Sequence, residues 1–230
     1  MILTIKVSGK FFDEDLERGE PRNLSLLSNE ILNLVSEGHR IAVVTGGGAT
    51  ARKYIALARK IYPNESMLDV LGIASSRLNA HLLLLSLRDF AYSRIPESLE
   101  RLVEFWGLGK VIVAGGFQPG QSTTAVAALV AEATNSQFLV NCTNIDGVFE
   151  RDPRDDPSAR LLERIKVGEL RKILSSSRSA AGTYELADTL ALNVLERSGI
   201  SMIVMNFSKV SALRQLLKGE TRFGTIVEPK

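Results

Sequence analysis

Cysteine is almost missing from this chain of 230 residues, because Cys142 is the only one. One thiol closes no disulfide within the chain and builds no cysteine metal cluster, which excludes disulfide-stapled folds and zinc–cysteine sites. Histidine is also scarce, and neither His39 nor His81 stands in a Ser/His/Asp spacing. We interpret Cys142 as a packed thiol rather than a nucleophile, and its isolation favours a reducing cytoplasm.

An excess of charge of one sign is also absent, because 28 Lys and Arg stand against 26 Asp and Glu, for a formal net charge of +2. Without a strong field we expect neither a nucleic acid nor an anionic membrane as a partner. Apolar runs such as residues 82–85 are far too short to cross a bilayer. Residues 1–6 have neither the basic segment nor the cleavage site of a signal peptide, so we expect a cytoplasmic protein.

Short apolar runs rich in β-branched residues alternate with helical patterns along the chain. Runs such as 41–44 and 111–114 are apolar on both faces, which is typical of parallel strands covered by helices on each side. This alternation predicts an α/β sandwich. Strands are predicted at 2–7, 41–45, 90–94, 111–114, 138–142, 202–205 and 224–227, and helices at 24–37, 49–61, 66–87, 96–106, 123–134, 167–174, 185–197 and 210–217. Residues 153–161 and 175–182 lack a regular pattern and are interpreted as mobile surface loops.

Three successive glycines, Gly46–Gly48, close a buried strand and precede a helix. Ligands of parallel sheets bind at the carboxyl ends of strands, and a helix N-terminus with free amides attracts phosphate. Arg52 follows about one helical turn later and can reach back toward an anion. The alternative is a plain tight turn, which is weakened because each glycine costs roughly 1 kcal/mol of backbone entropy.

The segment 115–124 repeats this arrangement, with two glycines after a buried strand, a polar loop and a helix. Ser122, Thr123 or Thr124 is expected to cap that helix, and the other hydroxyls and amides would form a second anion site. Two anion sites suggest two phosphorylated ligands, a donor and an acceptor.

Lys6 interrupts an apolar strand and is followed by Ser8, Gly9 and Lys10. Glycine lets a ligand approach the backbone, so two lysines would flank a phosphate-binding turn. The spacing is not that of a P-loop. The alternative is a strand-end lysine whose ammonium reaches solvent along its own stem.

Polar residues 143–153 directly follow the strand that ends at Cys142. Their Asp-Gly pair is a turn signal, and the strand-end position favours ligand contact. Asp188 is a further acidic candidate within the predicted helix 185–197, where a solvated or capping carboxylate is the alternative.

Together these motifs resemble those of the amino acid kinase superfamily, and most closely the archaeal-type uridylate kinases. The resemblance covers nearly the whole chain. It implies one domain, residues 1–230, built as a three-layer α/β/α sandwich with a mostly parallel, twisted central sheet. It also implies an N-terminal acceptor lobe of about residues 1–135 and a C-terminal nucleotide lobe of about residues 136–230. It rests on residues 6–10, 45–48 with Arg52, Asp69 before Leu-Gly-Ile, 115–123, 143–149, 152–153 and 182–188.

The resemblance implies an enzyme that transfers the γ-phosphoryl group of ATP to UMP in pyrimidine nucleotide biosynthesis, with Mg²⁺ accompanying ATP. Lys6, Lys10 and Asp188 are the catalytic residues that it implies: Lys6 bridges the two phosphates, and Asp188 orients the lysines or a metal. No protein side chain is assigned to the metal. The implied ATP site consists of Ser8, Gly9, Lys10, Gly47, Arg52, Thr143, Asn144, Phe149 and Asp152. The implied UMP site consists of Gly46, Asp69 on the ribose hydroxyls, Gly116, Phe117, Gln118, Pro119, Gly120, Gln121, Ser122 and Thr123.

Two alternatives stay open beside this reaction. Isopentenyl phosphate kinases place a histidine just after the glycine turn, where this chain has Ala49-Thr50-Ala51, and carbamate and acetylglutamate kinases fit the loop 117–122 poorly. A non-catalytic nucleotide-binding module is the other alternative, against which Lys6, Lys10 and Asp188 argue.

Ala125 departs from many relatives, which carry an aspartate after the paired threonines. We hypothesise that Lys10 compensates by adding a cation. The resemblance also implies a homohexamer, a trimer of dimers. The apolar residues 82–85, Phe90 and Tyr92 are then either part of an interface or part of the core.

Overall fold

The computed structural model describes residues 1–151, 156, 158–176 and 186–230. Within these residues a 7-stranded sheet has the order β3-β2-β1-β4-β8-β9-β7, and β5 pairs with β6 in a separate hairpin. Neighbouring strands of the sheet are parallel, except for the antiparallel pair β8 and β9. The strands are β1 Ile2–Val7, β2 Arg40–Thr45, β3 Ile112–Ala114, β4 Phe138–Thr143, β5 Val148–Phe149, β6 Leu161–Leu162, β7 Arg164–Lys166, β8 Ser201–Asn206 and β9 Gly224–Glu228.

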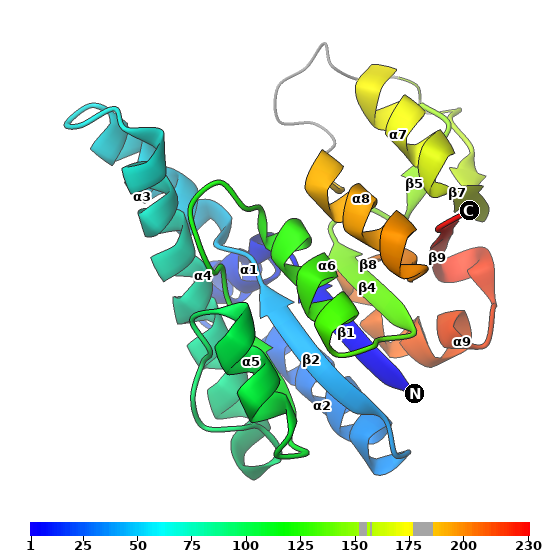
Figure 1. Ribbon diagram of the computed structural model, residues 1–230, viewed down its shortest axis with the longest axis horizontal. Coiled ribbons are helices and arrows are strands. Elements are labelled where there is room, and N and C mark those ends of the chain that lie inside the picture. Colours follow the sequence, from blue (N-terminus) through cyan, green and yellow to red (C-terminus); the bar gives the residue numbers. More distant parts are fainter. Residues whose placement is uncertain (152–155, 157, 177–185) are drawn as a thin grey trace.

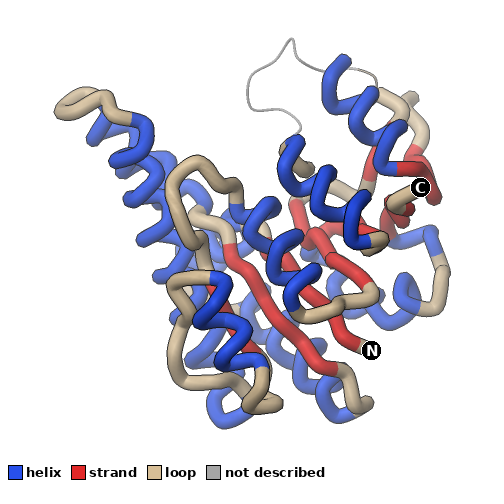
Figure 2. Tube along the Cα trace, in the orientation of Figure 1, coloured by secondary structure: helices blue, strands red, loops and turns tan. Residues whose placement is uncertain are grey.

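Helices lie on both sides of this sheet, as Figure 1 and the tube in Figure 2 show. Within the described part of the chain, three short 3₁₀ helices supplement them: η1 Arg88–Phe90, η2 Phe207–Ala212 and η3 Thr221–Phe223. The α-helices are α1 Gly9–Arg18, α2 Arg22–Ser36, α3 Gly48–Arg59, α4 Glu65–Leu87, α5 Leu99–Trp106, α6 Thr123–Ala133, α7 Val167–Ser176, α8 Thr189–Ser198 and α9 Leu213–Leu217.

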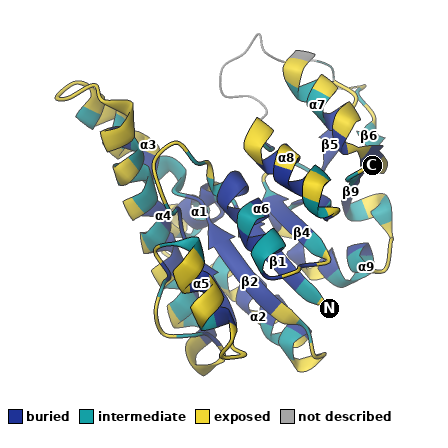
Figure 3. Ribbon diagram, viewed as in Figure 1, coloured by how far each residue is buried: buried dark blue, intermediate teal, exposed yellow. Residues whose placement is uncertain are grey.

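Alternate residues of the central strands enter two cores, one on each face of the sheet. Ile5 and Val7 of β1 join a core to which α1, α2, α4 and the segment η2–α9 contribute. Ala42 and Val44 of β2 belong to the opposite core, to which α5, α6, α7 and α8 contribute. Buried residues line the sheet between these layers (Figure 3). The predicted three-layer α/β/α sandwich with a mostly parallel sheet is confirmed.

Helix α3 stands at the margin of the molecule and packs on α4 and α1. Of the described residues, one helical stretch, Glu65–Phe90, is long and apolar enough by length and composition to cross a membrane. Core helices pass the same test. Here α4 packs against α2, α3, β2 and β3.

Several predicted elements need correction. Residues 90–94 form no strand, because Arg88–Phe90 is a 3₁₀ helix and Ala91 makes only an isolated bridge to Val111. The helix predicted from residue 96 begins at Leu99, where Ser98 caps it. The helix predicted at 185–197 begins at Thr189, and the one predicted at 210–217 is partly 3₁₀. The other predicted helices and strands are confirmed, with ends shifted by a few residues.

Helix α1 was missed altogether, because its first residues were interpreted as part of a phosphate-binding turn. Phe11 and Phe12 supply its buried face, with ring centroids 5.0 Å apart in an edge-to-face arrangement. Phe11 also meets Phe207 at 5.7 Å. Much of the two predicted loops, 153–161 and 175–182, lies outside the described residues.

Candidate active site

Lys6 is buried near the carboxyl end of β1, with 7% of its surface exposed. Strand pairing sets it beside Val44 of β2 and Asn141 of β4. A lysine whose ammonium reached bulk solvent would be more exposed, so that alternative is wrong. A cavity of about 550 Å³ adjoins it, whose polar lining from α6, α7 and α8 includes Ser122, Thr123, Thr124, Arg171, Asp188 and Thr189.

The turn Gly46–Gly48 packs against the start of α1 with backbone touching backbone. A methyl group on Gly9 would stand 1.9 Å from the amide nitrogen of Gly48, a distance that no side chain tolerates. Gly48 itself has φ +69°, the left-handed conformation that favours glycine. The amide of Gly46 donates to the Val7 carbonyl at 2.8 Å. The two turns predicted as separate motifs therefore form one packed unit.

Side chains of α4 hold the same turn from behind. Asn79 Nδ2 donates to the Gly46 carbonyl at 2.8 Å, and Ser75 Oγ donates to the Gly47 carbonyl at 2.8 Å. Thr45, just before the turn, donates through Oγ1 to the Ser76 carbonyl at 2.7 Å. These bonds fix the shape of the turn before any ligand arrives, which is the arrangement that a phosphate cradle requires.

A carboxylate of the protein occupies the N-terminus of α3. Both oxygens of Asp13 accept the Ala49 amide, at 2.9 and 2.7 Å. We expected this helix end to offer free amides to phosphate, and for Ala49 that is wrong, because α1 supplies an anion to this donor. Arg52 lies nearby with its side chain 72% exposed, and its Nη2 is 3.8 Å from Asp13 Oδ2.

The loop after β3 is tied down at two points. The Gly116 amide donates to Ser76 Oγ at 2.8 Å, and the Gly120 amide donates to Asp69 Oδ2 at 2.8 Å. The segment ends at Ser122, whose hydroxyl accepts the Ala125 amide at 3.0 Å and caps α6 as expected. Between the two ties Phe117 is half-buried, whereas Gln118 and Pro119 are exposed, and Gln121, just after the second tie, is half-buried. Asp69 and the loop 116–122 are thus brought together.

Thr143 and Asn144 end β4 and begin the next loop. Thr143 Oγ1 donates to Asn144 Oδ1 at 3.4 Å. Asp146 of the same loop accepts a hydrogen bond of 3.0 Å from Nδ2 of Asn206, the last residue of β8. Phe149 is half-buried in β5, and Asp152 lies outside the described residues.

Asp188 does not lie inside α8 but is its N-cap, so the alternative of a capping carboxylate is confirmed. Its Oδ1 accepts the Ala191 amide at 2.8 Å. Asn141, the neighbour of Lys6 on β4, donates to the Leu186 carbonyl at 2.8 Å and so holds the segment that leads to the cap. Asp188 still lines the cavity together with Lys6, which unites two of the three predicted catalytic residues. Lys10, the third, is exposed on the first turn of α1.

Burial raises the pKa of the Cys142 thiol to about 12, although the nearby Lys6 opposes the rise. The thiol therefore stays protonated near neutral pH and is no nucleophile. This confirms the interpretation of Cys142 as a packed side chain.

Residues 1–206 match the family model of the amino acid kinase family.

The chain belongs to the amino acid kinase family.

Within this family, the chain is 53% identical to the uridylate kinase of Sulfolobus acidocaldarius over 231 residues, which cover 100% of both chains. It is also 53% identical to the uridylate kinase of Metallosphaera sedula over 230 residues, again 100% of both. The crystal structure of uridylate kinase from Archaeoglobus fulgidus matches with a TM-score of 0.84 and 32% identity, over 99% of this chain and 100% of that one. The resemblance that the motifs indicated is confirmed, and the amino acid kinase fold with it.

Sequence reasoning missed the side chains that hold the family's motifs together. Ser75, Ser76 and Asn79 are polar residues on one side of a largely apolar helix, and that contrast is a signal that a search for buried polar contacts would find. Asp13 follows Gly9 by four residues, but the spacing has meaning only once α1 is known to be a helix. Nothing in the sequence singles out Arg171, which lines the cavity.

Proposed function

We propose that this amino acid kinase is a uridylate kinase, which transfers the γ-phosphoryl group of ATP to UMP and yields ADP and UDP. Two relatives named uridylate kinase, each 53% identical over the full chain, support it. The observation that carries the proposal is the position of Lys6, buried near the carboxyl end of β1 and lining a cavity with Asp188 and Thr123.

Transfer of a phosphoryl group to UMP requires cations and amide donors around the phosphates rather than a general base. The phosphate of UMP is already an anion, so in-line placement and neutralisation of the transferred group supply the catalysis. In the proposed mechanism Lys6 bridges the donor and acceptor phosphates, and Lys10 adds a second cation from the start of α1. Asp188 orients these lysines or a metal across the cavity. The packed turn Gly46–Gly48 fixes the distance between the two phosphates.

The acceptor site that we propose lies between α4 and the loop 116–122. Asp69 would accept the ribose hydroxyls of UMP, and the backbone from Gly116 to Thr123 would surround the uracil and its phosphate, with Gly46 below. The existing bond from the Gly120 amide to Asp69 supports this pairing of a carboxylate with the loop. One oxygen that binds an amide and one that binds a hydroxyl are compatible on a single carboxylate.

The donor site that we propose lies around the start of α1 and the loop after β4. Ser8, Gly9, Lys10, Gly47 and Arg52 would contact the ATP phosphates. The residues Thr143, Asn144, Phe149 and Asp152 would hold the nucleoside, Asp152 being outside the described residues. The carboxyl ends of β1, β2 and β4, which precede these groups, lie at one edge of the sheet, where ligands of parallel sheets bind.

Mg²⁺ is proposed to accompany ATP. Among the described residues no group of three or more His, Cys, Asp and Glu side chains gathers into a metal site, and Asp188 is a carboxylate that lines the cavity. Such a donor set fits Mg²⁺ held chiefly by phosphates and water, as is usual for this ion. When bound, it neutralises charge on the phosphate oxygens, while the lysines do so from the protein side.

Ala125 is fully buried in α6, at the position where the resemblance implies an aspartate in many relatives. Our hypothesis that Lys10 compensates for the missing group predicts a strong loss of turnover in Lys10→Ala. Full turnover by that variant would rule the hypothesis out.

The assembly that we propose is a homohexamer, a trimer of dimers. Apolar side chains more than half exposed on α3, on α4 and in the turn between them support it: Tyr54, Leu57, Ile61, Leu78 and Leu85. The residues expected either in an interface or in the core include members of both kinds. Leu83 lies in the core, whereas Phe90 is 54% exposed. The ring of Tyr92 packs on that of Phe105, with centroids 4.4 Å apart. Multi-angle light scattering at micromolar concentration should give the hexamer mass, and Leu57→Lys should reduce it. A monomer mass for the unaltered chain would contradict the assembly.

The two lobes and the cellular setting are proposed on the resemblance alone. Residues 1–135 would form the acceptor lobe and residues 136–230 the nucleotide lobe, in a cytoplasmic enzyme of pyrimidine nucleotide biosynthesis. Small-angle scattering with and without nucleotides would test the division. A change in the radius of gyration would support two lobes that move about their boundary.

The decisive assay couples ADP release to a spectrophotometric signal with UMP, CMP and isopentenyl phosphate as acceptors. We expect UMP to be phosphorylated, and Lys6→Ala to lower kcat at least about a hundredfold, because a preorganised charge in such a site contributes that much. Turnover with isopentenyl phosphate alone would assign the chain to that kinase class. No turnover with any acceptor would favour a nucleotide-binding module.

A further inference from the structure

Asp13 is a buried carboxylate to which the proposed reaction gives no role. It is 8% exposed and lies on α1, four residues after Gly9 and three after Lys10. Residues at this spacing share one face of a helix, so Asp13 lies behind the two residues that begin the donor site. Both its oxygens accept the Ala49 amide, at 2.9 and 2.7 Å.

The turn Gly46–Gly48 is shaped around this carboxylate. A methyl group on Gly48 would stand 2.5 Å from Asp13 Oδ1 and 2.8 Å from Oδ2. Arg52, one turn into α3, has its Nη2 3.8 Å from Asp13 Oδ2. The Asp13 side chain is 10% exposed, whereas that of Arg52 is 72% exposed. The anion is therefore fixed, and the guanidinium is the partner that can move toward a ligand.

We propose that Asp13 is a positioning residue, which holds Arg52 and the Gly47–Gly48 turn in place for the phosphates of ATP. The inference rests on the proposed function, in which Arg52 contacts a phosphate. The Ala49 bond fixes α3 against α1, and the carboxylate charge keeps Arg52 beside the turn instead of free in solvent. Lys10 on α1 and Arg52 on α3 then approach the same phosphate chain from two helices.

A purely structural role is the alternative, because a carboxylate at a helix N-terminus stabilises the helix wherever the helix lies. The two roles differ in one respect. Capping depends on the Ala49 amide alone, whereas positioning depends on the charge that faces Arg52. An asparagine at position 13 keeps an oxygen for the amide and removes the charge, so it separates them.

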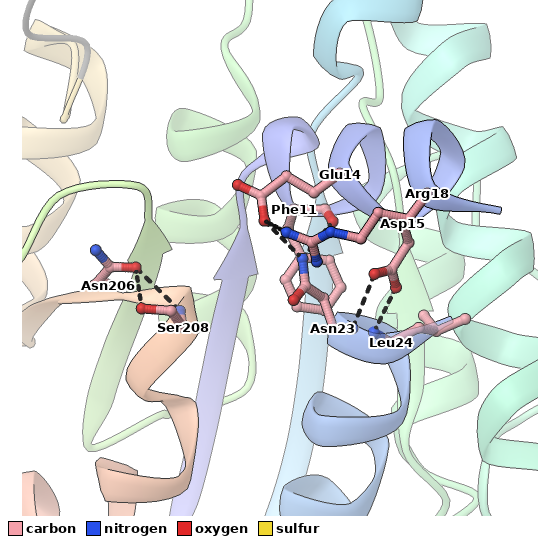
Figure 4. A network of polar contacts seen from close by, with 8 residues as sticks. All are labelled: Phe11, Glu14, Asp15, Arg18, Asn23, Leu24, Asn206 and Ser208. Atoms are coloured by element: carbon pink, nitrogen blue, oxygen red, sulfur yellow. Dashed lines mark hydrogen bonds and ion pairs between the residues drawn. The ribbon is translucent and has the colours of Figure 1, made fainter. Parts of the chain in front are cut away.

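Asp15 offers a matched control two residues along the same helix. Its oxygens accept the amides of Asn23 at 2.9 Å and Leu24 at 2.8 Å, and so cap α2 (Figure 4). This contact lies at the α1–α2 corner, away from the glycine turn. Asp15→Asn therefore removes a similar carboxylate from a helix start without touching Arg52.

The test is a cycle of Asp13→Asn, Arg52→Ala and the double variant, with Asp15→Asn as control. ATP affinity is measured by isothermal titration calorimetry with Mg²⁺, and kcat/KM is measured with UMP. We expect Asp13→Asn to weaken ATP binding about threefold to fivefold, the range that one exposed ion pair supplies. The same change should have no further effect in the Arg52→Ala background. Asp15→Asn should lower the melting temperature and leave ATP affinity unchanged.

An equal loss in both backgrounds would overturn the inference, since it would show capping alone. Unchanged or tighter ATP binding by Asp13→Asn would also overturn it. If Asp13→Asn does not fold, Asp13→Ser replaces it in the same cycle, because serine also offers an oxygen to the Ala49 amide and carries no charge, and the same outcomes apply. Failure of the unaltered chain to phosphorylate UMP would contradict the proposed function instead, while the ATP titrations still test Asp13.

Discussion

The segments that follow β2 and β3 both begin with packed glycines, but they differ farther along the chain. In the first, Gly48 has φ +69° and is crowded by the Asp13 carboxylate and by the backbone of Gly9. In the second, Gly120 has φ +80°, yet nothing lies within 4 Å of the place where its side chain would be. A methyl group on Gly115 would stand 2.7 Å from the Arg77 amide nitrogen, so the second segment is packed where it leaves β3. Beyond that point it is a strap tied at Gly116 and Gly120.

This difference matches what each turn would have to do. A floor shared by two phosphates must not move, because in-line transfer depends on fixed distances. A loop that surrounds a single substrate must open to admit it, so few ties and open space suit it. The similar motifs of the sequence thus carry unlike physical roles.

The largest expected effect is the loss of stability on substituting a glycine of the packed first turn. Gly48→Ala should destabilise the protein by about 4 kcal/mol or prevent folding, because a methyl group meets both a carboxylate and a positive φ. Gly120→Ala has the same φ problem without the clash, so it should cost only about 1 kcal/mol. Urea denaturation followed by circular dichroism measures both, and equal losses would show that packing does not distinguish the turns.

Removing the tie at the start of the strap should have the next largest effect. Ser76→Ala leaves the buried Gly116 amide without the acceptor that it now has at 2.8 Å, which costs about 2 kcal/mol. Urea denaturation measures this loss, and UMP kinetics should show a raised KM as well. Thr134→Ala removes a hydroxyl bonded to the Val130 carbonyl at 2.8 Å in α6 and serves as a control that should leave KM unaltered.

Cutting the second tie should affect binding more than folding. In Asp69→Ala the loop loses its bond to the Gly120 amide and UMP loses the proposed ribose contact, so KM for UMP should rise about tenfold, the effect of one charge-assisted hydrogen bond. The melting temperature should stay within a few degrees of the unaltered value. An unchanged KM for UMP together with a raised KM for ATP would assign the loop to the donor instead.

The smallest effect lies far from both turns, at the contact of α2 with α9. Burial raises the pKa of Glu30 above its ordinary value of 4.5, although Arg214 opposes the rise. The folded state then holds the proton more tightly than the unfolded state. The stability that Glu30 contributes is present below pH 4.5 and is lost as the pH rises through the raised pKa.

The unfolding free energy of Glu30→Gln minus that of the unaltered chain should accordingly rise with pH just above pH 4.5, and both KM values should stay unchanged. Urea denaturation across this range measures it. A difference that falls as the pH rises would show that Arg214, which donates to Glu30 Oε1 at 3.1 Å, outweighs burial.

Much of the fold followed from local pattern, and the errors have physical causes. Strands 2–7 and 41–45 were predictable because burial on both faces demands continuous apolar residues. Helix α1 was not, because its apolar face rests on Phe11 and Phe12 alone, next to residues that suit a phosphate turn. The antiparallel β9 could not be told from a parallel strand, since orientation depends on the path of the chain and not on the residues.

The parts of the candidate site that were predictable are the glycine turns, where the backbone itself forms the site. Gly9 and Gly48 were singled out as glycines for the approach of a ligand, and the structure adds a second reason. The backbone of Gly48 fills the side-chain position of Gly9, and the Asp13 carboxylate fills that of Gly48. The supports were not predictable, since Asp13, Ser76 and Asn79 act across long distances in sequence. A motif marks where a ligand can approach, whereas the contacts that hold the motif in place appear only in three dimensions.

One measurement tests the central claim most directly: a crystal structure with UMP and a non-hydrolysable ATP analogue bound together. The account predicts both phosphates over the turn Gly46–Gly48 beside Lys6, with the uracil enclosed by the loop 116–122. Relative to the free protein, that loop should shift while the turn stays in place. A displaced turn with an unmoved loop, or an adenine enclosed by the loop, would contradict it.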